Sequence, residues 1–433
     1  MAYQTHTPIH LQTNPSKDRL LDAFKGKSLD ELRTPAFIID RNVFAQNCAN
    51  MHSKAREWGV TFRAHLKTHK TAEGATLQLR STENQTHAVV VSTMMEAWEV
   101  VRAGLVANGT VNDILYGMPV AVNKVDDLAS LRRELEAHGG AVKLLVDHPD
   151  QVKFLEKYES SRETPKRWLA FVKINGGQNR AGVYPDSPAL TELVKVILAS
   201  PAVTLHGFYG HAGNSYASTS LSEASAFLSG EVQCVNIAAK SALDLLKSGF
   251  PEASVSKPFV LSVGSTPTAH AASAEAKKLL SEVLHGALEL HAGNYPMLDL
   301  QQQHTSLIDH ARIAQRVRAT VVSYYPGRGA DGRDEALVDA GAIAFSKDTG
   351  PFKVFGEVIG RPWTLSRISQ EHGVLVCNEA PGTNKPLELG TVVEIIGQHA
   401  CLIAAAYPWY YIVDSGVEDG KKVVDIWVPW KGW

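Results

Sequence analysis

The sequence predicts an α/β protein in which a (β/α)8 barrel is followed by a smaller, mostly antiparallel β-domain. Eight strand-like runs alternate with helix-length amphipathic segments, and each parallel crossover needs a connection of that length. The alternating region covers about 230 residues, close to the roughly 250 of a typical barrel. No G-x-G-x-x-G follows the first strand of this region, which favours the barrel over a doubly wound open sheet. After residue 300 the strand-like runs continue without helices, as expected for an all-β unit.

The elements follow in order along the chain. Residues 34–40 (TPAFIID) open the ordered region, and 42–59 have the apolar spacing of a helix. The expected barrel strands are 60–67, 87–93, 113–118, 141–147, 167–175, 203–211, 258–266 and 286–294. The expected β-domain strands are 312–326, 335–346, 352–360, 372–379, 390–397 and 399–414. We therefore expect a tail over 1–33 that packs on the β-domain, a barrel over 34–305 and the β-domain over 306–433.

Composition excludes several classes of protein. The net charge of -2 provides no basic surface for nucleic acid. There is no run of about 18 apolar residues that could span a bilayer, and the first residues lack the apolar core of a signal peptide. Four scattered cysteines without a C-x-x-C pair argue against a disulfide framework. We therefore expect a soluble, cytoplasmic protein.

Candidate site residues gather where the barrel strands end, which is where barrel enzymes place their chemistry. The first strand ends at Lys67, within the unusually basic stretch RAHLKTHK (63–70). The fifth runs into NGGQNRAG, which contains Arg180, and the sixth ends at Tyr209 and His211. The seventh and eighth end in the loops GSTPT and HAGNY.

A lysine, an arginine and two glycine-bearing loops together suggest pyridoxal 5'-phosphate held on Lys67 as a Schiff base. Burial at the end of a strand would lower the pKa of the Lys67 amine, and small loops let backbone amides approach a phosphate. Each feature alone has a simpler explanation. Either loop is most simply a tight turn, and Lys67 and Lys70 could reach solvent from a surface loop.

The stretch RAHLKTHK resembles the cofactor-lysine motif of the alanine racemase-like, fold-type III pyridoxal phosphate enzymes. It is most similar to their D-serine dehydratase and D-threonine aldolase branch, whose motif is R-P-H-x-K-T-H-K; here Ala64 replaces the proline. NRAGV, FYGHAGNSY, GSTPT, ELHAGNY and QHAC extend the resemblance over nearly the whole ordered chain. It implies a barrel followed by a β-domain, and a head-to-tail homodimer with active sites near the interface.

The resemblance also assigns expected roles to residues. Lys67 carries the cofactor, Arg180 approaches its phenolic oxygen, and Tyr209 and His211 line the ring. The position that contacts the pyridine nitrogen in alanine racemases is His291 here. The phosphate is expected on Gly264, Ser265, Thr266, Gly293 and Asn294, with the Tyr216 hydroxyl.

His399 and Cys401 form an H-x-C pair near the C-terminus. If 399–414 is a strand, residues two apart share a face, and imidazole and thiolate both bind zinc. By itself such a pair is more often structural. In the family it resembles the zinc ligands of the D-serine dehydratases, the other positions being left to water or substrate.

The resemblance implies zinc- and pyridoxal phosphate-dependent dehydration of D-serine to pyruvate and ammonia, in D-amino acid metabolism and detoxification. Lys67 would take the α-proton, and zinc would act on the β-hydroxyl. D-Threonine aldolase activity is the nearest alternative, although the soft thiolate favours zinc and hence dehydration. Racemisation would need a second acid such as Tyr324 or Tyr325. A cofactor-binding homeostasis protein is disfavoured by the strands after residue 300.

Overall fold

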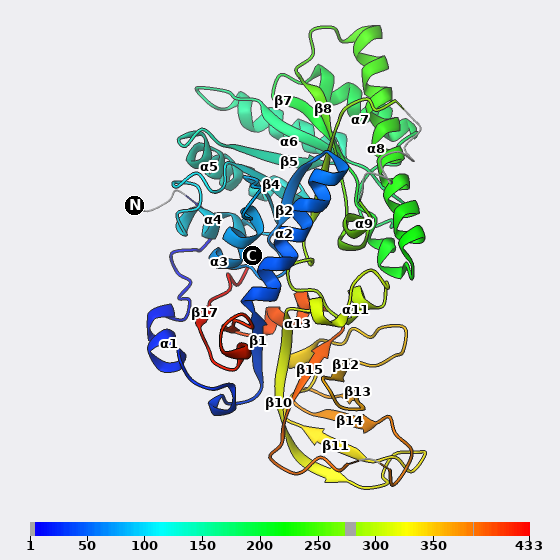
Figure 1. The fold of residues 1–433 in the computed structure, drawn as a ribbon. Helices are drawn as coiled ribbons and strands as arrows, with labels where there is room; N and C mark the ends of the chain where they lie inside the picture. The colour runs from blue at the N-terminus through cyan, green and yellow to red at the C-terminus, as the bar shows by residue number, and fades with distance from the viewer. Residues whose placement is uncertain (1–4, 273–282, 384) are drawn as a thin grey trace.

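The computed structural model describes residues 5–272, 283–383 and 385–433, which form a barrel and a sheet domain stacked end to end (Figure 1). Eight parallel strands close the barrel in sequence order, and the outermost two pair with each other. The predicted fold class is therefore confirmed. The barrel strands are β2 (Thr61–His65), β3 (Ala88–Val91), β4 (Asp113–Pro119), β5 (Ala141–Val146), β6 (Trp168–Lys173), β7 (Val203–Tyr209), β8 (Val255–Val263) and β9 (Ala287–Ala292).

Amphipathic helices cover the barrel because their apolar faces and the β-branched strands bury each other. The first of them begins at the side chain of Asp40, which accepts the N–H groups of Asn42 and Val43, and it ends at Gly59 (φ 73°). The helices of this part are α2 (Arg41–Trp58), α3 (Ala72–Leu79), α4 (Met94–Arg102), α5 (Val125–Glu136), α6 (Pro149–Ser160), α7 (Pro188–Ala199), α8 (Leu221–Gly249) and α9 (Thr266–Ala271).

The β-domain is a nine-stranded, mostly antiparallel sheet in the order β11-β14-β13-β12-β15-β10-β1-β16-β17. Its strands are β1 (Ala36–Asp40), β10 (Gln315–Tyr325), β11 (Glu335–Val338), β12 (Gly356–Val358), β13 (Trp363–Ile368), β14 (Gly373–Cys377), β15 (Val392–Gly397), β16 (Tyr410–Val413) and β17 (Asp425–Trp427). Short helices accompany it: α11 (Leu300–Gln303), α12 (Ala342–Phe345) and α13 (Ala400–Ala406).

The first strand lies in the β-domain, whereas its residues fall within the range that the sequence analysis gave to the barrel. β1 pairs antiparallel with β10 and parallel with β16, so the chain starts the second sheet before it enters the barrel. Figure 1 shows β1 beside β10, although about 275 residues separate them in sequence. All five residues of β1 are buried. A buried strand of either domain can have such an apolar run without alternation, so the sequence pattern alone does not assign β1 to one domain.

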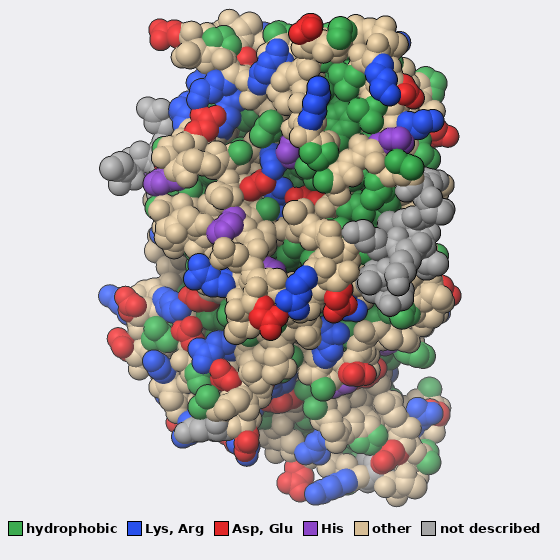
Figure 2. All heavy atoms as spheres, turned by 45° about the horizontal axis from the view of Figure 1, so that its top comes forward, with side chains coloured by type: hydrophobic (Ala, Val, Ile, Leu, Met, Phe, Trp, Pro, Cys, Tyr) green, Lys and Arg blue, Asp and Glu red, His purple; other side chains and the backbone are tan. Residues whose placement is uncertain are grey.

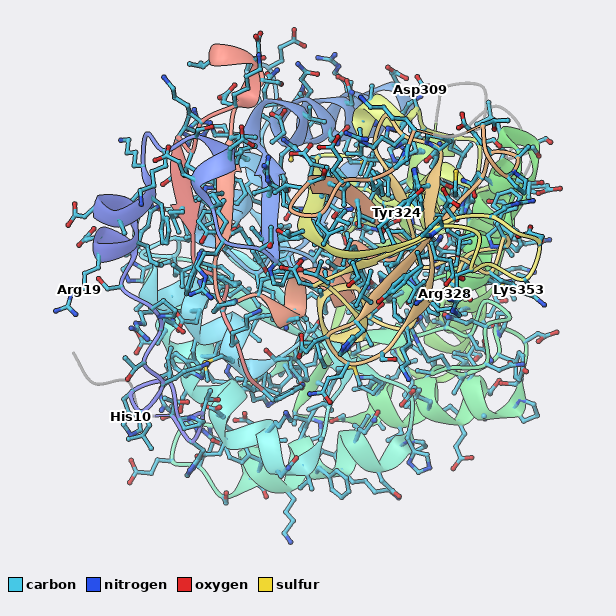
Figure 3. All side chains as sticks on the ribbon, turned by 90° about the horizontal axis from the view of Figure 1, so that it is seen from below. His10, Arg19, Asp309, Tyr324, Arg328 and Lys353 are labelled. Atoms are coloured by element: carbon cyan, nitrogen blue, oxygen red, sulfur yellow. The ribbon has the colours of Figure 1, made fainter. Side chains whose placement is uncertain are left out.

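The N-terminal residues contact both parts. Thr5 and Thr7 donate to Asp127 on α5, and Asn14 Nδ2 donates to Glu99 Oε1 on α4 at 3.2 Å. The helix that follows, α1 (Lys17–Phe24), packs its apolar side against the outer strands β16 and β17 of the sheet. In Figure 3, His10 and Arg19 mark this side of the molecule, opposite Arg328 and Lys353.

On the face shown in Figure 2, lysines and arginines are interspersed with aspartates and glutamates, in keeping with the small net charge. Within the described residues, no helix has both the length and the apolar character needed to cross a membrane.

Candidate active site

The ten predicted cofactor residues line one cavity at the C-terminal end of the barrel strands. They come from the segments that follow β2, β6, β7, β8 and β9, which the closed barrel brings to one mouth. They are Lys67, Arg180, Tyr209, His211, Tyr216, Gly264, Ser265, Thr266, Gly293 and Asn294, and His65, Gly117, Lys173, His291 and Ala292 complete the lining.

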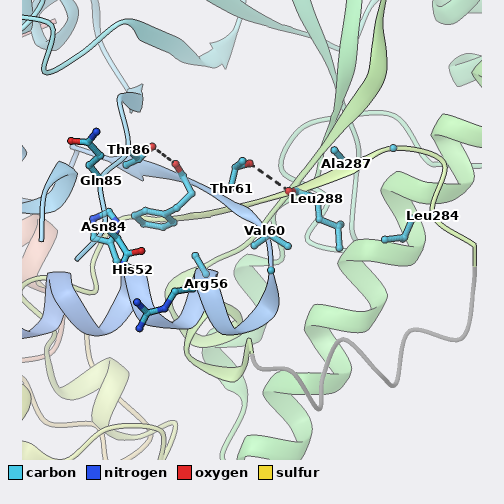
Figure 4. A pocket seen from close by; sticks show the side chains of 14 residues that line it. His52, Arg56, Val60, Thr61, Asn84, Gln85, Thr86, Leu284, Ala287 and Leu288 are labelled. Carbon is cyan, nitrogen blue, oxygen red and sulfur yellow. Dashed lines mark hydrogen bonds between the residues drawn. The ribbon is translucent and has the colours of Figure 1, made fainter. Parts of the chain in front are cut away.

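A larger cavity of about 710 Å³ lies at the opposite, N-terminal ends of β2 and β9 (Figure 4). Thr61 Oγ1 donates to the Leu288 carbonyl at 3.4 Å at its edge, and His52 and Arg56 reach it from α2. None of the predicted site residues lines this cavity. Because barrel enzymes react at the C-terminal ends of the strands, we assign the chemistry to the other cavity.

Arg63, the first basic residue of RAHLKTHK, is structural. It is 1% exposed inside the barrel, where its Nη1 lies 2.7 Å from Asp113 Oδ1 and its Nε lies 2.9 Å from Glu289 Oε1. Two carboxylates thus satisfy a guanidinium that burial would otherwise destabilise strongly. Arg63 therefore fills the barrel interior below the cavity.

Lys67 sits in a tight turn that the Lys70 N–H closes on the Leu66 carbonyl at 3.0 Å. Lys70 turns away from the cavity, and its Nζ lies 3.0 Å from Glu96 Oε1. Lys67 is half-buried, and among the described residues its amine has no ion-pair partner. The turn therefore presents one unpaired amine to the cavity.

Sequence reasoning missed a second lysine of the cavity, Lys173. It is the last residue of β6, and its Nζ donates to the Ile174 carbonyl at 3.1 Å. Burial, and then the charge of Arg180, lower the pKa of Lys173 to about 8. A lysine at the end of an apolar strand was the available signal, the same one that identified Lys67. Among the described residues neither Lys173 nor Arg180 forms an ion pair, so the cavity suits an anion.

His291 stacks on Tyr209 at 4.1 Å between ring centroids and 9° between planes. The Ser262 hydroxyl donates to Glu289 Oε1 at 2.8 Å, so at 3.0 Å it accepts the hydrogen of His291 Nδ1. Burial keeps the pKa of His291 well below its ordinary value. The imidazole is therefore neutral, and its buried Nε2 has no partner among the described residues.

His211 and Gly264 belong to facing loops. His211 Nδ1 donates to the Gly264 carbonyl at 2.7 Å, and burial, with the charges of Lys67 and Lys173, lowers the pKa of His211 to about 3. Gly264 has a φ of 142°, and a Cβ there would lie 2.1 Å from the His291 carbonyl oxygen. No side chain fits at this position, so the backbone is bare where the predicted phosphate loop begins.

Hydroxyl groups crowd the same loops. Ser215 Oγ lies 2.7 Å from Ser265 Oγ, the Ser265 N–H donates to Thr268 Oγ1 at 2.8 Å, and the Asn294 N–H donates to Thr266 Oγ1 at 3.1 Å. The cluster supplies many hydrogen-bond donors around a bare glycine. Together with the two unpaired cations and the free His291 nitrogen, it fits a phosphorylated heterocycle.

The expectation that His399 and Cys401 lie on a strand is wrong. β15 ends at Gly397, His399 is the N-cap of α13, and Cys401 is in the first turn of that helix. The alanine-rich sequence ACLIAAA explains the difference, because alanine has the highest helix propensity. The helix start nevertheless brings the two side chains together, close enough for each to shift the pKa of the other.

The pair has the surroundings of a metal ligand set. His399 Nδ1 lies 2.6 Å from Asp348 Oδ2, which sequence reasoning missed, and this leaves Nε2 available. Burial disfavours both the imidazolium form of His399 and the thiolate form of Cys401. Cys401, Asp299 and Asp348 together outweigh burial and raise the pKa of His399. His399, and then Lys67 and Thr68, lower the pKa of Cys401. The described residues contain no group of three or more His, Cys, Asp or Glu that could hold a metal ion.

The tyrosines considered as a second acid for racemisation lie on β10 in the β-domain (Figure 3). The Tyr324 hydroxyl is engaged by Asp334, and the Tyr325 ring stacks under the Arg328 guanidinium at 3.4 Å. Neither tyrosine lines the cavity of its own chain.

Comparison with known proteins agrees with the fold. The family model described as "Putative serine dehydratase domain" matches residues 314–413. The D-serine dehydratase of Schizosaccharomyces pombe is 43% identical over 97% of each chain, and that of Saccharomyces cerevisiae is 34% identical over 96% of this chain and 99% of its own. The solved D-threo-3-hydroxyaspartate dehydratase from Delftia sp. HT23 has a TM-score of 0.77 and 28% identity, over 94% of this chain and all of its own. The chain thus belongs to the D-serine dehydratase family, within the alanine racemase-like fold.

Proposed function

We propose that this protein is a D-serine ammonia-lyase that dehydrates D-serine to pyruvate and ammonia with pyridoxal phosphate and zinc. One contact carries the proposal: the hydroxyl of Thr68, the residue after Lys67, lies 3.1 Å from the Cys401 sulfur. An amine suited to a cofactor and a thiolate suited to a metal therefore adjoin the same small space.

The residues of the cavity fit the cofactor. Lys67 would hold it, Arg180 and Lys173 would balance its negative charge, and the loops at Gly264 and Gly293 would hold its phosphate. When bound, pyridoxal phosphate withdraws electrons from the α-carbon of an amino acid. The Lys67 amine would be the base that takes the α-proton of the substrate.

The neutral His291 would offer its free Nε2 to the heterocycle as an acceptor. An acceptor satisfies a pyridine nitrogen only if that nitrogen carries a proton. The residues of this chain thus favour a ring whose nitrogen is protonated.

The metal part of the proposal rests on His399 and Cys401. Zinc bound there would act as a Lewis acid on the substrate β-hydroxyl, which is a poor leaving group without such help. Asp348 would fix the tautomer of His399, and Thr68 would orient the thiolate. Two solved Delftia variants replace a histidine, or the cysteine two positions after it, by alanine, and the cysteine variant is in a metal-free form. The same H-x-C spacing supports a metal role here.

We further propose a cytoplasmic homodimer whose barrel binds the cofactor and whose β-domain carries the zinc ligands. The family resemblance supports this assembly.

The deciding experiment incubates the purified protein with D-serine, L-serine and D-threonine and measures pyruvate and aldehyde separately. We expect pyruvate from D-serine, little from L-serine, and no glycine with aldehyde from D-threonine. Aldehyde as the main product would instead support the aldolase alternative. Reduction with borohydride followed by peptide mapping should place the cofactor on Lys67, and a modified Lys70 or Lys173 would contradict the assignment.

A further inference from the structure

The last residues of the chain contact both halves of the proposed site. After β17 the chain leaves the sheet and runs between the Lys67 turn and α13, which carries Cys401. We call residues 430–433 the C-terminal clasp. None of them lines the cavity, so they cannot touch a substrate from this chain.

One contact holds the lysine turn. The Trp430 N–H donates to the Lys70 carbonyl at 2.7 Å. The N–H of Lys70 closes the turn on Leu66, so both backbone polar groups of Lys70 are hydrogen-bonded. Lys70 has a φ of 51°, which is costly for a residue with a side chain and persists only where the surroundings fix it. The Trp430 side chain is 5% exposed and belongs to the main hydrophobic core. The donor is therefore anchored.

The next residue, Lys431, contacts α13, which we call the metal-pair helix because Cys401 lies on it. Lys431 Nζ donates to the carbonyls of Ala405 at 2.6 Å and Ala404 at 3.1 Å, at the C-terminal end of α13. An ammonium group at this end interacts favourably with the helix dipole. The Ala404 carbonyl also accepts the Tyr410 hydroxyl at 3.1 Å, so Lys431 adds to the contacts that hold this end of the helix. Because α13 has only seven residues, holding its last turn also fixes its first turn, where Cys401 lies.

The clasp is itself held in place. Gln12 Nε2 donates to the Lys431 carbonyl at 2.7 Å, so the N-terminal segment lies across the clasp. Burial, and then the charge of Lys70, lower the pKa of Lys431 to about 8.

We propose that the C-terminal clasp positions the cofactor lysine turn and the metal-pair helix relative to each other, with Lys431 as a positioning residue for Cys401. The inference rests on the proposed function for the identity of the two bound groups, but the contacts it uses involve neither. Trp430 and Lys431 together donate three hydrogen bonds, one to the lysine turn of the barrel and two to α13 of the β-domain.

The test compares Lys431→Met, a chain ending at Pro429, and Lys247→Met as a control. Lys247 is an exposed lysine in the last turn of α8, so its ammonium group also lies near the C-terminal end of a helix, but outside the site. Amide hydrogen exchange is measured for peptides covering 66–71 and 399–406, and zinc and pyridoxal phosphate affinities are measured by titration of the stripped protein.

In Lys431→Met we expect faster exchange in 399–406 only, and zinc affinity lowered about twofold to fivefold, the range for a cation at a helix end. The shortened chain should also exchange faster in 66–71 and bind pyridoxal phosphate more weakly. Unchanged exchange in 399–406 in Lys431→Met, or an equal change in Lys247→Met, would overturn the proposal.

A wild-type protein that binds no zinc would contradict the metal part of the proposed function, while the exchange data would still decide on the clasp. If the shortened chain does not fold, Lys431→Met retains the decisive measurement, because it keeps every backbone contact.

Discussion

The cavity contains two lysines whose surroundings give them different roles. Lys67 sits on a turn and is half-buried, whereas Lys173 is 6% exposed at the end of a strand and bonded to backbone carbonyls. A carbonyl cofactor needs an amine that can leave its hydrogen bonds and approach the ring, which favours Lys67. A fixed, poorly solvated ammonium is better suited to attract the phosphate.

Replacement of Lys173 by methionine should stabilise the cofactor-free protein. The pKa of Lys173 falls from 10.5 to about 8 on folding, so the folded state disfavours its charge. The stability of the wild type should therefore rise as pH increases from about 8 to 10.5, because the unfolded chain binds the extra proton in that window. Lys173→Met should lack this rise and be more stable at pH 7 by up to about 3 kcal/mol.

Thermal or urea unfolding across this pH range measures the effect. An equal pH slope in Lys173→Met and wild type would show that Lys173 is solvated in the cofactor-free state. The same variant should bind pyridoxal phosphate more weakly, because it removes a positive charge beside the proposed phosphate.

Cys401 provides a second residue-scale prediction. Cys401→Ala should lower the kcat for D-serine dehydration by at least about 100-fold, because the Lewis acid would lose one of its two protein ligands. Its visible absorbance from bound cofactor should remain, since Cys401 is not among the residues that line the cofactor cavity. Metal analysis and kinetics on the same sample check both parts; retained activity without zinc would disprove a catalytic metal.

At the scale of elements, α8 supports the loop that carries His211 and Tyr216. Glu231 of α8 is buried, and its carboxylate accepts the Ala212 N–H at 2.5 Å. Burial raises the pKa of Glu231 to about 7. The folded protein therefore binds this proton more tightly than the unfolded chain, and the contribution of Glu231 to stability falls as pH rises from about 4.5 to 7.

Glu231→Gln should remove that dependence, because an amide keeps the acceptor for Ala212 and carries no charge. We expect the variant to equal the wild type near pH 5 and to exceed it by about 1–3 kcal/mol at pH 8. Denaturant unfolding at the two pH values gives the comparison. A wild type whose stability is the same at both would mean that the Glu231 carboxylate is adequately solvated.

The sequence was sufficient for the barrel strands because each apolar run ends at polar or glycine residues that mark the mouth of the barrel. It was sufficient for the cavity because the lining residues follow those ends directly. It failed for α13, where alanine propensity prevailed over an apparent strand. Asp348 could not be identified from the sequence, because its role depends on its contact with His399, which lies 51 positions later in the chain. Lys173 could have been found, because it satisfies the same rule as Lys67.

At the scale of the whole molecule, the chain passes through the β-domain twice. Phe37, Ile38 and Ile39 of β1 are fully buried, and Phe37 stacks on Tyr407 at 5.2 Å between ring centroids. The order of the sheet puts β1 between β10 and β16, so its removal would leave two unpaired edges in the middle of the sheet. The barrel is thus inserted into the sequence of the β-domain, which is built from two separate segments of the chain.

Because β1 lies in the middle of the β-domain sheet, we can predict which fragments of the chain should unfold cooperatively. A fragment of residues 306–433 should fail to unfold cooperatively, because it lacks β1 and exposes the apolar residues that β1 covers, each worth about 1.5–3 kcal/mol. The Asp40 N–H donates to the Ala314 carbonyl at 2.7 Å, and β1 runs antiparallel to β10. A second fragment that joins residues 28–40 to 314–433 through a short glycine-containing turn should restore the central strand as a hairpin.

We expect the joined fragment to show a cooperative thermal transition and slow amide exchange in β10 and β16, with neither feature in 306–433. A third fragment in which Phe37 and Ile39 are replaced by serine separates the effect of the buried side chains from that of the added backbone, and it should resemble 306–433. If 306–433 alone unfolds cooperatively with a midpoint equal to that of the joined fragment, β1 is dispensable for the stability of the β-domain.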